Sequence, residues 1–160
     1  MSNITEEEIQ KILPEKGPSF EEVKNYLEKY NDEYIVIKCG GSVLVNQDLF
    51  DNFINDITIL NKLGFIPIII HGGGKKISNR LSEAGIKSSF INGLRVTDEK
   101  SIKIVEEVLN IFNKEIISAL KNNGCDSEGI TNKNNNILTV KQENQSLGFV
   151  GSPKEIKQSI

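Results

Sequence analysis

The stretch FIPIIIHGGGKKIS, residues 65–78, combines the features that decide the fold. It begins with an apolar, largely β-branched run over residues 65–70, which is typical of a buried strand. Three glycines end that run, and a segment with helical spacing follows over residues 75–84, where Gly85 supplies a stop. The stretch therefore predicts a strand, a tight turn and a helix, which together are the building block of α/β folds.

A second unit of the same kind precedes it. The run YIVIK, residues 34–38, predicts a buried strand that stops at Gly40 and Gly41. A helix is expected over residues 48–63, and Gly64 supplies its C-terminal stop. The buried stripe of this helix is expected to comprise Leu49, Phe53, Ile57 and Leu60.

Two helices are expected before the first strand. Residues 5–12 show a short amphipathic pattern that ends before Pro14. The next helix begins at Ser19, which can form a capping box with Glu22. The apolar face of this helix comprises Phe20, Val23, Tyr26 and Leu27.

The second half of the chain continues the alternation. Residues 88–96, SSFINGLRV, are expected to be extended, and Thr97 or Asp98 caps a long helix that ends at the NNG of residues 122–124. The apolar residues of this helix expected on its buried side are Ile102, Val105, Val108, Leu109, Phe112, Ile116 and Leu120. A strand, a hairpin and a loop tip at residues 131–136, TNKNNN, are predicted to follow.

The last residues predict the start of another helix, because proline at position 153 suits a first helical turn after Ser152. Taken together, the segments predict an α/β fold, a three-layer αβα sandwich with a mainly parallel sheet. In an open sheet of this kind, ligands bind beyond the carboxyl ends of the strands, which is where both glycine turns are expected.

Composition argues against several classes of function. The 160-residue chain has a formal net charge of −3 and a pI near 5.3, which provides no general basic field for nucleic acid or an anionic membrane. The apolar run at residues 65–70 is far shorter than the ~20 residues that a membrane-spanning helix needs. Cys39 and Cys125 lack metal-type spacing and suit a reducing compartment. We therefore expect a soluble, cytoplasmic protein with no nucleic-acid or membrane partner.

The glycine turns indicate bound anions. Glycine lets the backbone approach a ligand closely and adopt positive φ, and amides at the start of the next helix can hold phosphate or carboxylate. Neither standard nucleotide loop is present, because a P-loop needs Ser or Thr where Lys76 stands and the dinucleotide pattern needs glycine where Ile77 stands. A purely structural turn is the alternative interpretation.

Individual side chains offer further candidates, each with a structural alternative. Lys38 follows a strand, where its ammonium could meet phosphate oxygens, or it is a solvated edge residue. Arg95 could clamp a carboxylate through two hydrogen bonds, or lie on the surface. His71, the single histidine, lacks the partners of a catalytic triad, which favours a structural role. Asp98 and Glu99 suit a helix start better than acid–base catalysis, and no metal cluster is indicated.

Four segments, read together, resemble the amino-acid kinase family. They are VIKCGGS (36–42), IIIHGGGKKI (68–77), FINGLRVTDEK (90–100) and LGFVGSP (147–153), in the family's order and at similar separations. The resemblance runs from about Tyr34 to the end of the sequence. Lys-x-Gly-Gly (38–41) followed by His-Gly-Gly-Gly (71–74) marks the family as a whole. The NGLRVTD segment is more specific and points to the acetylglutamate branch of the family.

The resemblance implies a reaction and a donor site. The reaction is the ATP-dependent phosphorylation of the γ-carboxylate of N-acetyl-L-glutamate in arginine biosynthesis, with Mg²⁺ held mainly through the nucleotide and no protein metal ligand identified. Lys38 would stabilise the transferring phosphoryl group, while Gly40 and Gly41 would bring backbone amides to the γ-phosphate of ATP. Phosphoryl transfer depends on such positioning and charge neutralisation.

It also implies an acceptor site. Gly73 and Gly74 would hold the γ-carboxylate that accepts the phosphoryl group, and Arg95 would pair with the α-carboxylate of N-acetyl-L-glutamate. The acceptor is already a carboxylate, so no general base is required. Three local features depart from the family pattern. Cys39 replaces a usual tyrosine or aliphatic residue, and residues 129–136, GITNKNNN, are a loosened version of the family's glycine-rich segment. Lys75-Lys76 replaces a usual Pro-Gln, which adds positive charge near the acceptor.

The resemblance divides the chain into an N-terminal helical extension, residues 1–33, and an N-terminal, acetylglutamate-binding lobe, residues 34–160. Family members are nearly twice as long, and the second lobe that supplies their nucleotide pocket is absent from this sequence. We therefore expect the chain to be the substrate-binding lobe and to be inactive alone.

Several alternatives remain open. A homo-oligomer is implied, either a dimer or a hexamer in which the helix at residues 19–30 interlaces dimers, as in arginine-inhibited family members; packing on its own domain is the other role for that helix. Arginine is accordingly a candidate effector. The rival functions are a related amino-acid kinase with another carboxylate or carbamate substrate, and a non-catalytic amino-acid-binding or regulatory module.

Overall fold

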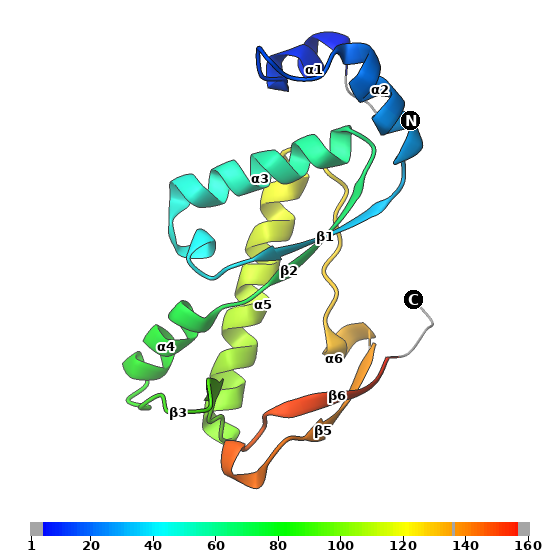
Figure 1. The fold of residues 1–160 in the computed structure, drawn as a ribbon. Coiled ribbons are helices and arrows are strands. Elements are labelled where there is room, and N and C mark those ends of the chain that lie inside the picture. Colours follow the sequence, from blue (N-terminus) through cyan, green and yellow to red (C-terminus); the bar gives the residue numbers. More distant parts are fainter. Residues whose placement is uncertain (1–4, 136, 157–160) are drawn as a thin grey trace. The chain divides into compact units, whose positions relative to one another are not determined.

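The computed structural model, drawn in Figure 1, describes residues 5–135 and 137–156. Helices and strands alternate along the chain and include a parallel strand pair, which confirms the predicted α/β class. The chain forms two compact units: Met1–His71 with Ala119–Asp126, and Gly72–Ser118 with Ser127–Ile160.

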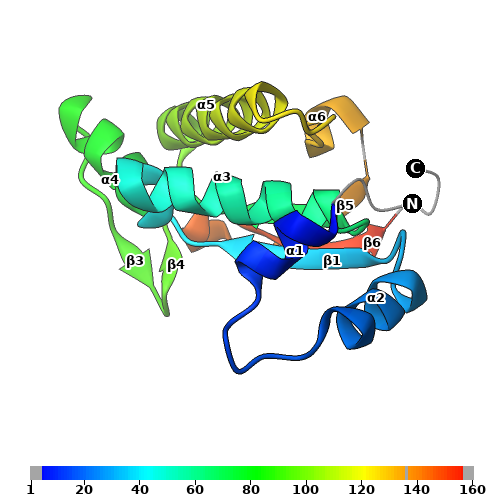
Figure 2. The ribbon, with the colours of Figure 1, turned by 90° about the horizontal axis from the view of Figure 1, so that it is seen from above.

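A parallel pair of strands forms the centre of the first unit. Strand β1, Tyr34–Cys39, pairs in register with β2, Ile66–His71, so that Cys39 lies beside His71. Helix α3, Gln47–Lys62, packs against β2 and covers one face of the pair (Figure 2). The two strands therefore end side by side, and each runs directly into its glycine turn.

The two strands are covered on one face only, whereas the sequence predicts buried strands. Exposed and partly buried residues alternate along both strands. Val36 is 62% exposed and Ile70 is 53% exposed, and Lys38 lies on the same open face. The prediction of buried strands was therefore wrong for one face, because a β-branched run indicates strand propensity and does not distinguish one-sided from two-sided burial.

Helix α3 confirms most of the predicted stripe. Ile57 is buried and Phe53 and Leu60 are partly buried, whereas Leu49 is 49% exposed. Ile54 and Thr58 are buried in addition. The Thr58 hydroxyl donates to the Ile54 carbonyl at 2.8 Å, which satisfies a polar group inside the core. The helix ends at the predicted stop, where Gly64 adopts a φ of 95°.

Two helices precede β1, as predicted. Helix α1 is Glu6–Ile12, and α2, Phe20–Lys29, begins at the predicted capping box. The Glu22 N–H donates to Ser19 Oγ at 3.3 Å, and the Ser19 N–H donates to the Glu22 carboxylate at 2.9 Å. These hydrogen bonds lower the pKa of Glu22 below its usual range.

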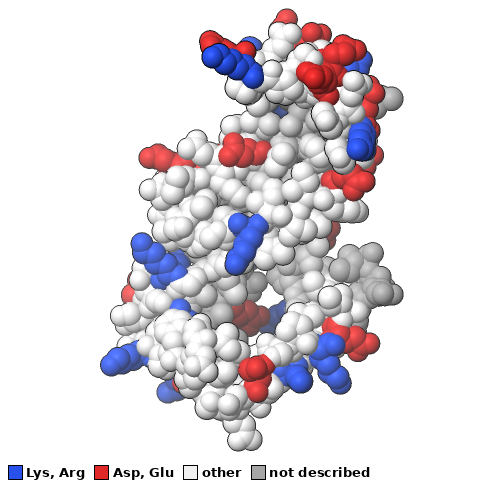
Figure 3. Space-filling model, viewed as in Figure 1, with Lys and Arg blue, Asp and Glu red and all other residues white. Residues whose placement is uncertain are grey.

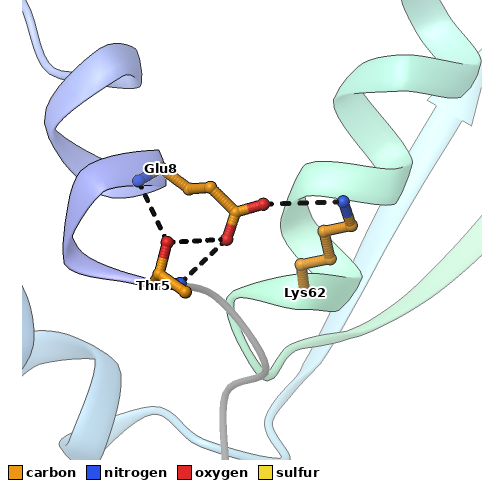
Figure 4. Close-up of polar contacts among 3 residues, drawn as sticks. All are labelled: Thr5, Glu8 and Lys62. Atoms are coloured by element: carbon orange, nitrogen blue, oxygen red, sulfur yellow. Dashed lines mark hydrogen bonds and ion pairs between the residues drawn. The ribbon is translucent and has the colours of Figure 1, made fainter.

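Helix α1 begins at a second capping box, which the sequence analysis missed. Thr5 and Glu8 exchange the same hydrogen bonds, and the Glu8 carboxylate also lies 4.0 Å from Lys62 Nζ of α3 (Figure 4). The backbone and hydroxyl of Thr5 lower the pKa of Glu8. The Thr-x-x-Glu spacing that identifies this box is present at residues 5–8 and could have been recognised.

The core of the second unit lies between two helices. Helix α4 is Gly74–Glu83, and α5 is Glu99–Asn122, whose first five turns belong to this unit. The α4 residues Ile77 and Leu81 are buried. The buried α5 residues of this unit are Ser101, Val108, Phe112 and Ile116. The predicted apolar stripe of α5 is therefore confirmed at its centre.

Two short hairpins complete this unit. Strands β3, Phe90–Ile91, and β4, Leu94–Arg95, pair antiparallel around Asn92 and Gly93, which both have positive φ. Strands β5, Leu138–Gln142, and β6, Gly151–Ile156, form the second hairpin.

Two predictions for the C-terminal third were wrong. The Ser152-Pro153 dipeptide lies within β6, where Ser152 pairs with Lys141, and does not start a helix. The pairing with β5 outweighs the local preference of proline for a helix start. Residues Asn132–Asn135 form the short helix α6, where the sequence predicts a loop tip.

The charged side chains show no separation by sign on the face drawn in Figure 3, where basic and acidic residues are interspersed. Among the residues that the structure describes, no helix combines the length and apolar character needed to cross a membrane.

Candidate functional site

Arg95 is the most highly connected of the predicted site residues. It ends β4, and its guanidinium donates to three acceptors: Ser88 Oγ at 2.6 Å from Nη1, Ser78 Oγ at 2.8 Å from Nη2, and the Gly74 carbonyl at 3.1 Å from Nη2. Its Cζ also lies 4.7 Å from the centre of the Phe90 ring. The surface alternative is thus wrong, because Arg95 is half-buried and held on several sides.

The amino terminus of α4 lies within this network. Gly73 is the N-cap and offers no side-chain cap, and the Ile77 N–H donates to the Gly73 carbonyl at 2.8 Å. The N–H groups of Gly74, Lys75 and Lys76 have no acceptor further back in the helix, as in every first helical turn. The first turn also contains no acidic residue. The terminus therefore presents free donors and positive dipole potential to an anion.

Close packing explains the glycine at position 73. A Cβ at this position would lie 3.1 Å from Leu109 Cδ2 and 3.5 Å from Phe112 Cδ2, both on α5. In contrast, a Cβ at Gly72 or Gly74 would meet nothing within 4 Å. Gly73 thus lets the start of α4 approach α5, while Gly74 leaves its own surroundings open.

The expectation that these turns need positive φ was wrong. The glycines with positive φ in the described part of the chain are Gly64, Gly85, Gly93, Gly124 and Gly148. Gly40, Gly72, Gly73 and Gly74 do not have positive φ. In both turns glycine is therefore explained by its small size, which allows close approach and packing. Its ability to adopt positive φ is not used there.

The two off-pattern lysines differ in their surroundings. Lys76 Nζ lies 4.4 Å from the centre of the Phe112 ring and 3.7 Å from the Glu115 carboxylate, so this lysine joins α4 to α5. Lys75 is exposed on the first turn of α4. The structure therefore accounts for Lys76 as a packing residue, whereas Lys75 adds positive charge at the helix terminus.

The other predicted site residues lie in the first unit. Lys38 is exposed near the end of β1, and a Cβ at Gly40 would meet only Ser42 Oγ, at 3.8 Å. Gly40 and Gly41 lead into a 3₁₀ turn, Val43–Val45, so no α-helix begins directly after KCGGS. The ammonium of Lys38 is thus exposed, and the Gly40 backbone is open to approach.

Asp98 and His71 are the remaining candidates. Asp98 caps α5, since the Ser101 N–H donates to its carboxylate at 2.8 Å, and this bond lowers the pKa of Asp98. His71 is the last residue of β2 and is half-buried beside Cys39. Burial raises the pKa of the Cys39 thiol. Across residues 5–135 and 137–156, no three His, Cys, Asp or Glu side chains gather as metal ligands.

Ser78 and Ser88 were missed from the sequence. Both contact the Arg95 guanidinium, from positions 17 and 7 residues away along the chain. Ser78 follows Gly74 by one helical turn, so a helix beginning at the glycines would have placed it beside them. No local pattern marks Ser88, because only the fold of residues 84–95 brings it to Arg95.

Comparison with known proteins identifies the family. The profile of the amino acid kinase family matches residues 33–159. The chain belongs to this family. It is 61% identical over 160 residues to the acetylglutamate kinase of Pelagibacter ubique (strain HTCC1062), covering all of this chain and 56% of that kinase. It is 40% identical over 137 residues to the acetylglutamate kinase of Campylobacter fetus subsp. fetus (strain 82-40), covering 84% of this chain and 49% of that kinase.

The chain spans about half the length of the curated relatives that it matches. Among solved structures, it resembles N-acetylglutamate synthase from Neisseria gonorrhoeae in complex with coenzyme A and N-acetyl-glutamate, with a TM-score of 0.67 and 21% identity. The structural match covers 86% of this chain and 32% of the synthase chain. It shows a shared fold and agrees with the α/β sandwich expected from the sequence.

Proposed function

We propose that this chain forms the acceptor-binding half of an acetylglutamate kinase, an ATP-dependent phosphotransferase that acts on the γ-carboxylate of N-acetyl-L-glutamate in arginine biosynthesis. The observation that carries the proposal is the hydrogen bond from Arg95 to the Gly74 carbonyl. It places a guanidinium beside the donor-rich start of α4. The guanidinium and the start of α4 are two neighbouring groups that could each bind an anion, which matches an acceptor with two carboxylates.

The acceptor would bind through both ends. The γ-carboxylate would accept hydrogen bonds from the N–H groups at Gly73 and Gly74, where the α4 dipole favours negative charge. The α-carboxylate would pair with Arg95 through an N–H group that its contacts with Ser78, Ser88 and Gly74 leave unused. Because the attacking oxygen is already ionised at neutral pH, the proposal includes no general base.

The donor contacts would come from the turn after β1. Lys38 would neutralise charge on the transferring phosphoryl group, and Gly40 and Gly41 would approach the γ-phosphate through their backbone amides. ATP, with Mg²⁺ carried mainly by its phosphates, supplies the phosphoryl group when bound. This chain's own contribution is then positioning and charge stabilisation.

Calorimetric titration of the 160-residue chain with N-acetyl-L-glutamate tests acceptor binding directly. N-acetyl-L-aspartate, which is one methylene shorter, is the matched control ligand. We expect binding of the glutamate derivative and at least tenfold weaker binding of the aspartate derivative, because a rigid pair of anion sites selects the spacing of the carboxylates. Absence of binding of N-acetyl-L-glutamate would contradict the proposal.

A chimera tests the reaction. Residues 1–160 would replace the aligned part of the Pelagibacter ubique acetylglutamate kinase, and ADP release that depends on N-acetyl-L-glutamate would be measured. We expect turnover, and a chimera with Lys38→Ala should retain acceptor binding while kcat falls by about 10²–10³, typical of losing one charge-stabilising group. Full activity of the Lys38→Ala chimera would remove Lys38 from its proposed role.

Two rivals remain distinguishable. A related amino-acid kinase would bind another carboxylate or carbamate better than N-acetyl-L-glutamate in the titration. A non-catalytic amino-acid-binding or regulatory module would bind the ligand while its chimera, correctly folded, showed no turnover. The NGLRVTD segment disfavours the first rival, and the presence of Lys38 together with Gly73, Gly74 and Arg95 argues against the second.

The proposal includes a homo-oligomer in the cytoplasm, with arginine as a candidate effector. Helix α2 supports self-association because none of its residues is buried, and Tyr26 and Tyr30 stack in parallel at 6.4 Å on its surface, 61% and 40% exposed. Deletion of residues 1–30 should therefore lower the number of chains per particle in analytical ultracentrifugation. An unchanged number of chains would leave α2 with the alternative role of packing on its own domain.

A further inference from the structure

Four groups of the protein contact the Arg95 guanidinium. Ser88 Oγ accepts from Nη1 at 2.6 Å and Ser78 Oγ accepts from Nη2 at 2.8 Å. The Gly74 carbonyl accepts from Nη2 at 3.1 Å, and the Phe90 ring lies 4.7 Å from Cζ. Two hydroxyls and a carbonyl thus hold the guanidinium edge, while an aromatic ring lies against its face.

These contacts leave donors for a ligand. A guanidinium carries five N–H groups, and both on Nη2 are used by Ser78 and Gly74. One on Nη1 is used by Ser88. Within the described part of the chain, no hydrogen bond occupies the Nε–H or the second N–H of Nη1. A carboxylate can therefore accept a single charge-assisted hydrogen bond, from Nε–H or from the remaining Nη1–H, without displacing the contacts that hold the side chain.

Ser78 also contacts the glycine turn. Its hydroxyl donates to the Gly74 carbonyl at 3.0 Å while it accepts from Arg95, so three groups form a closed triangle. The Gly74 carbonyl is anchored independently, because an α-helix directs the Ser78 N–H to it as well. Loss of the Ser78 hydroxyl would thus release Arg95 and leave the glycine turn in place.

We propose that Ser78 and Ser88 are positioning residues, which orient Arg95 toward the α-carboxylate of the acceptor and thereby set specificity for a ligand with two carboxylates. The inference rests on the proposed function and deepens it. An unrestrained arginine side chain loses much rotamer freedom when it captures a ligand, whereas one already held by serine hydroxyls loses little. The two serines therefore raise affinity for the α-carboxylate without touching it.

The test compares two ligands in calorimetric and NMR titrations of the full 160-residue chain. N-acetyl-L-glutamate has both carboxylates, whereas 4-acetamidobutanoate lacks only the α-carboxylate. Ser78→Ala and Ser88→Ala should each weaken N-acetyl-L-glutamate binding by about fivefold to tenfold, as expected for one hydrogen bond. Binding of 4-acetamidobutanoate should stay unchanged, since it does not use Arg95.

Three further variants isolate the role of Arg95. Ser78→Thr keeps the hydroxyl and should restore most of the affinity. Ser82→Ala, an exposed serine on the same helix, is the matched control and should bind as wild type. In an Arg95→Ala background, Ser78→Ala should have no additional effect, because the two residues then act as one unit.

Equal weakening of both ligands by Ser78→Ala, or an undiminished effect in the Arg95→Ala background, would overturn the inference in favour of a structural role. Unchanged binding of N-acetyl-L-glutamate by both serine variants would overturn it as well. If the wild-type chain binds neither ligand, the proposed function itself fails, and the inference fails with it.

Discussion

Thr97 and Gly148, although far apart in the sequence, pair as a parallel β-bridge. The Thr97 N–H donates to the Leu147 carbonyl at 3.0 Å, and the Phe149 N–H donates to the Thr97 carbonyl at 2.7 Å. Thr97 is buried at this contact. The bridge joins the segment that carries Arg95 to the LGFVGSP segment, so two of the motifs that identify the family are held together by backbone hydrogen bonds.

Gly148→Ala should destabilise the protein by about 2 kcal/mol or more. Gly148 has a φ of 67° and a ψ of −120°, which L-residues avoid, and a Cβ there would collide with the Thr97 carbonyl. Urea unfolding measures the change. Gly72→Ala is the matched control and should change stability by less than about 0.5 kcal/mol, since its Cβ meets nothing within 4 Å. Equal stability of the two variants would disprove the steric account.

Gly73→Ala should cost about 0.5–1.5 kcal/mol, because alanine is a poor N-cap and its Cβ would press on Leu109. Leu109 must shift by a few tenths of an ångström to accept the 3.1 Å contact. Leu109→Ala should remove part of this cost, so the double variant should lose less than the sum of the two single changes. Strict additivity in chemical denaturation would show that Leu109 is not the obstacle.

Arg95→Ala should weaken N-acetyl-L-glutamate binding by about 1.5–3 kcal/mol, typical of a charged hydrogen bond. Arg95→Lys should recover little of this loss, since an ammonium cannot bond to Ser78, Ser88 and a carboxylate in the plane of a guanidinium. Calorimetry gives both values, and thermal melting of each variant controls for folding. A lysine variant with wild-type affinity would show that charge alone is sufficient.

Asp98, which caps α5, should make the stability of the protein fall at acidic pH. The Ser101 N–H lowers the pKa of Asp98, so its stabilising contribution is present above the ordinary aspartate pKa and is lost as pH falls through the lowered value. Asp98→Asn keeps an acceptor for Ser101 and should remove this part of the acid dependence, whereas Asp98→Ala should lower Tm even at neutral pH. Melting curves of the three proteins from neutral to acidic pH test this. Identical acid profiles for wild type and Asp98→Asn would assign the dependence to other groups.

The site could be predicted only in part, because some of its features depend on neighbouring residues and others on residues far apart in the sequence. The donor-rich start of α4 follows from three glycines after an apolar run, which is a local pattern. The fixation of Arg95 depends on Ser88 and Ser78, and no periodicity marks either serine as its partner. Lys76 was expected to add charge at the acceptor, but the ring of Phe112 and the carboxylate of Glu115 hold it against α5.

The sequence by itself determined the features whose causes lie within a few residues. The capping box of Ser19 and Glu22 and the stops at Gly64 and Gly85 follow from hydrogen bonds and backbone angles of adjacent residues. Tertiary structure decided the rest. Ser152 and Pro153 lie in a strand because β5 offers a partner, and position 148 requires glycine because the Thr97 carbonyl occupies the space of a side chain. Contacts between distant segments override weak local preferences, since they contribute burial and hydrogen bonds that propensity alone does not include.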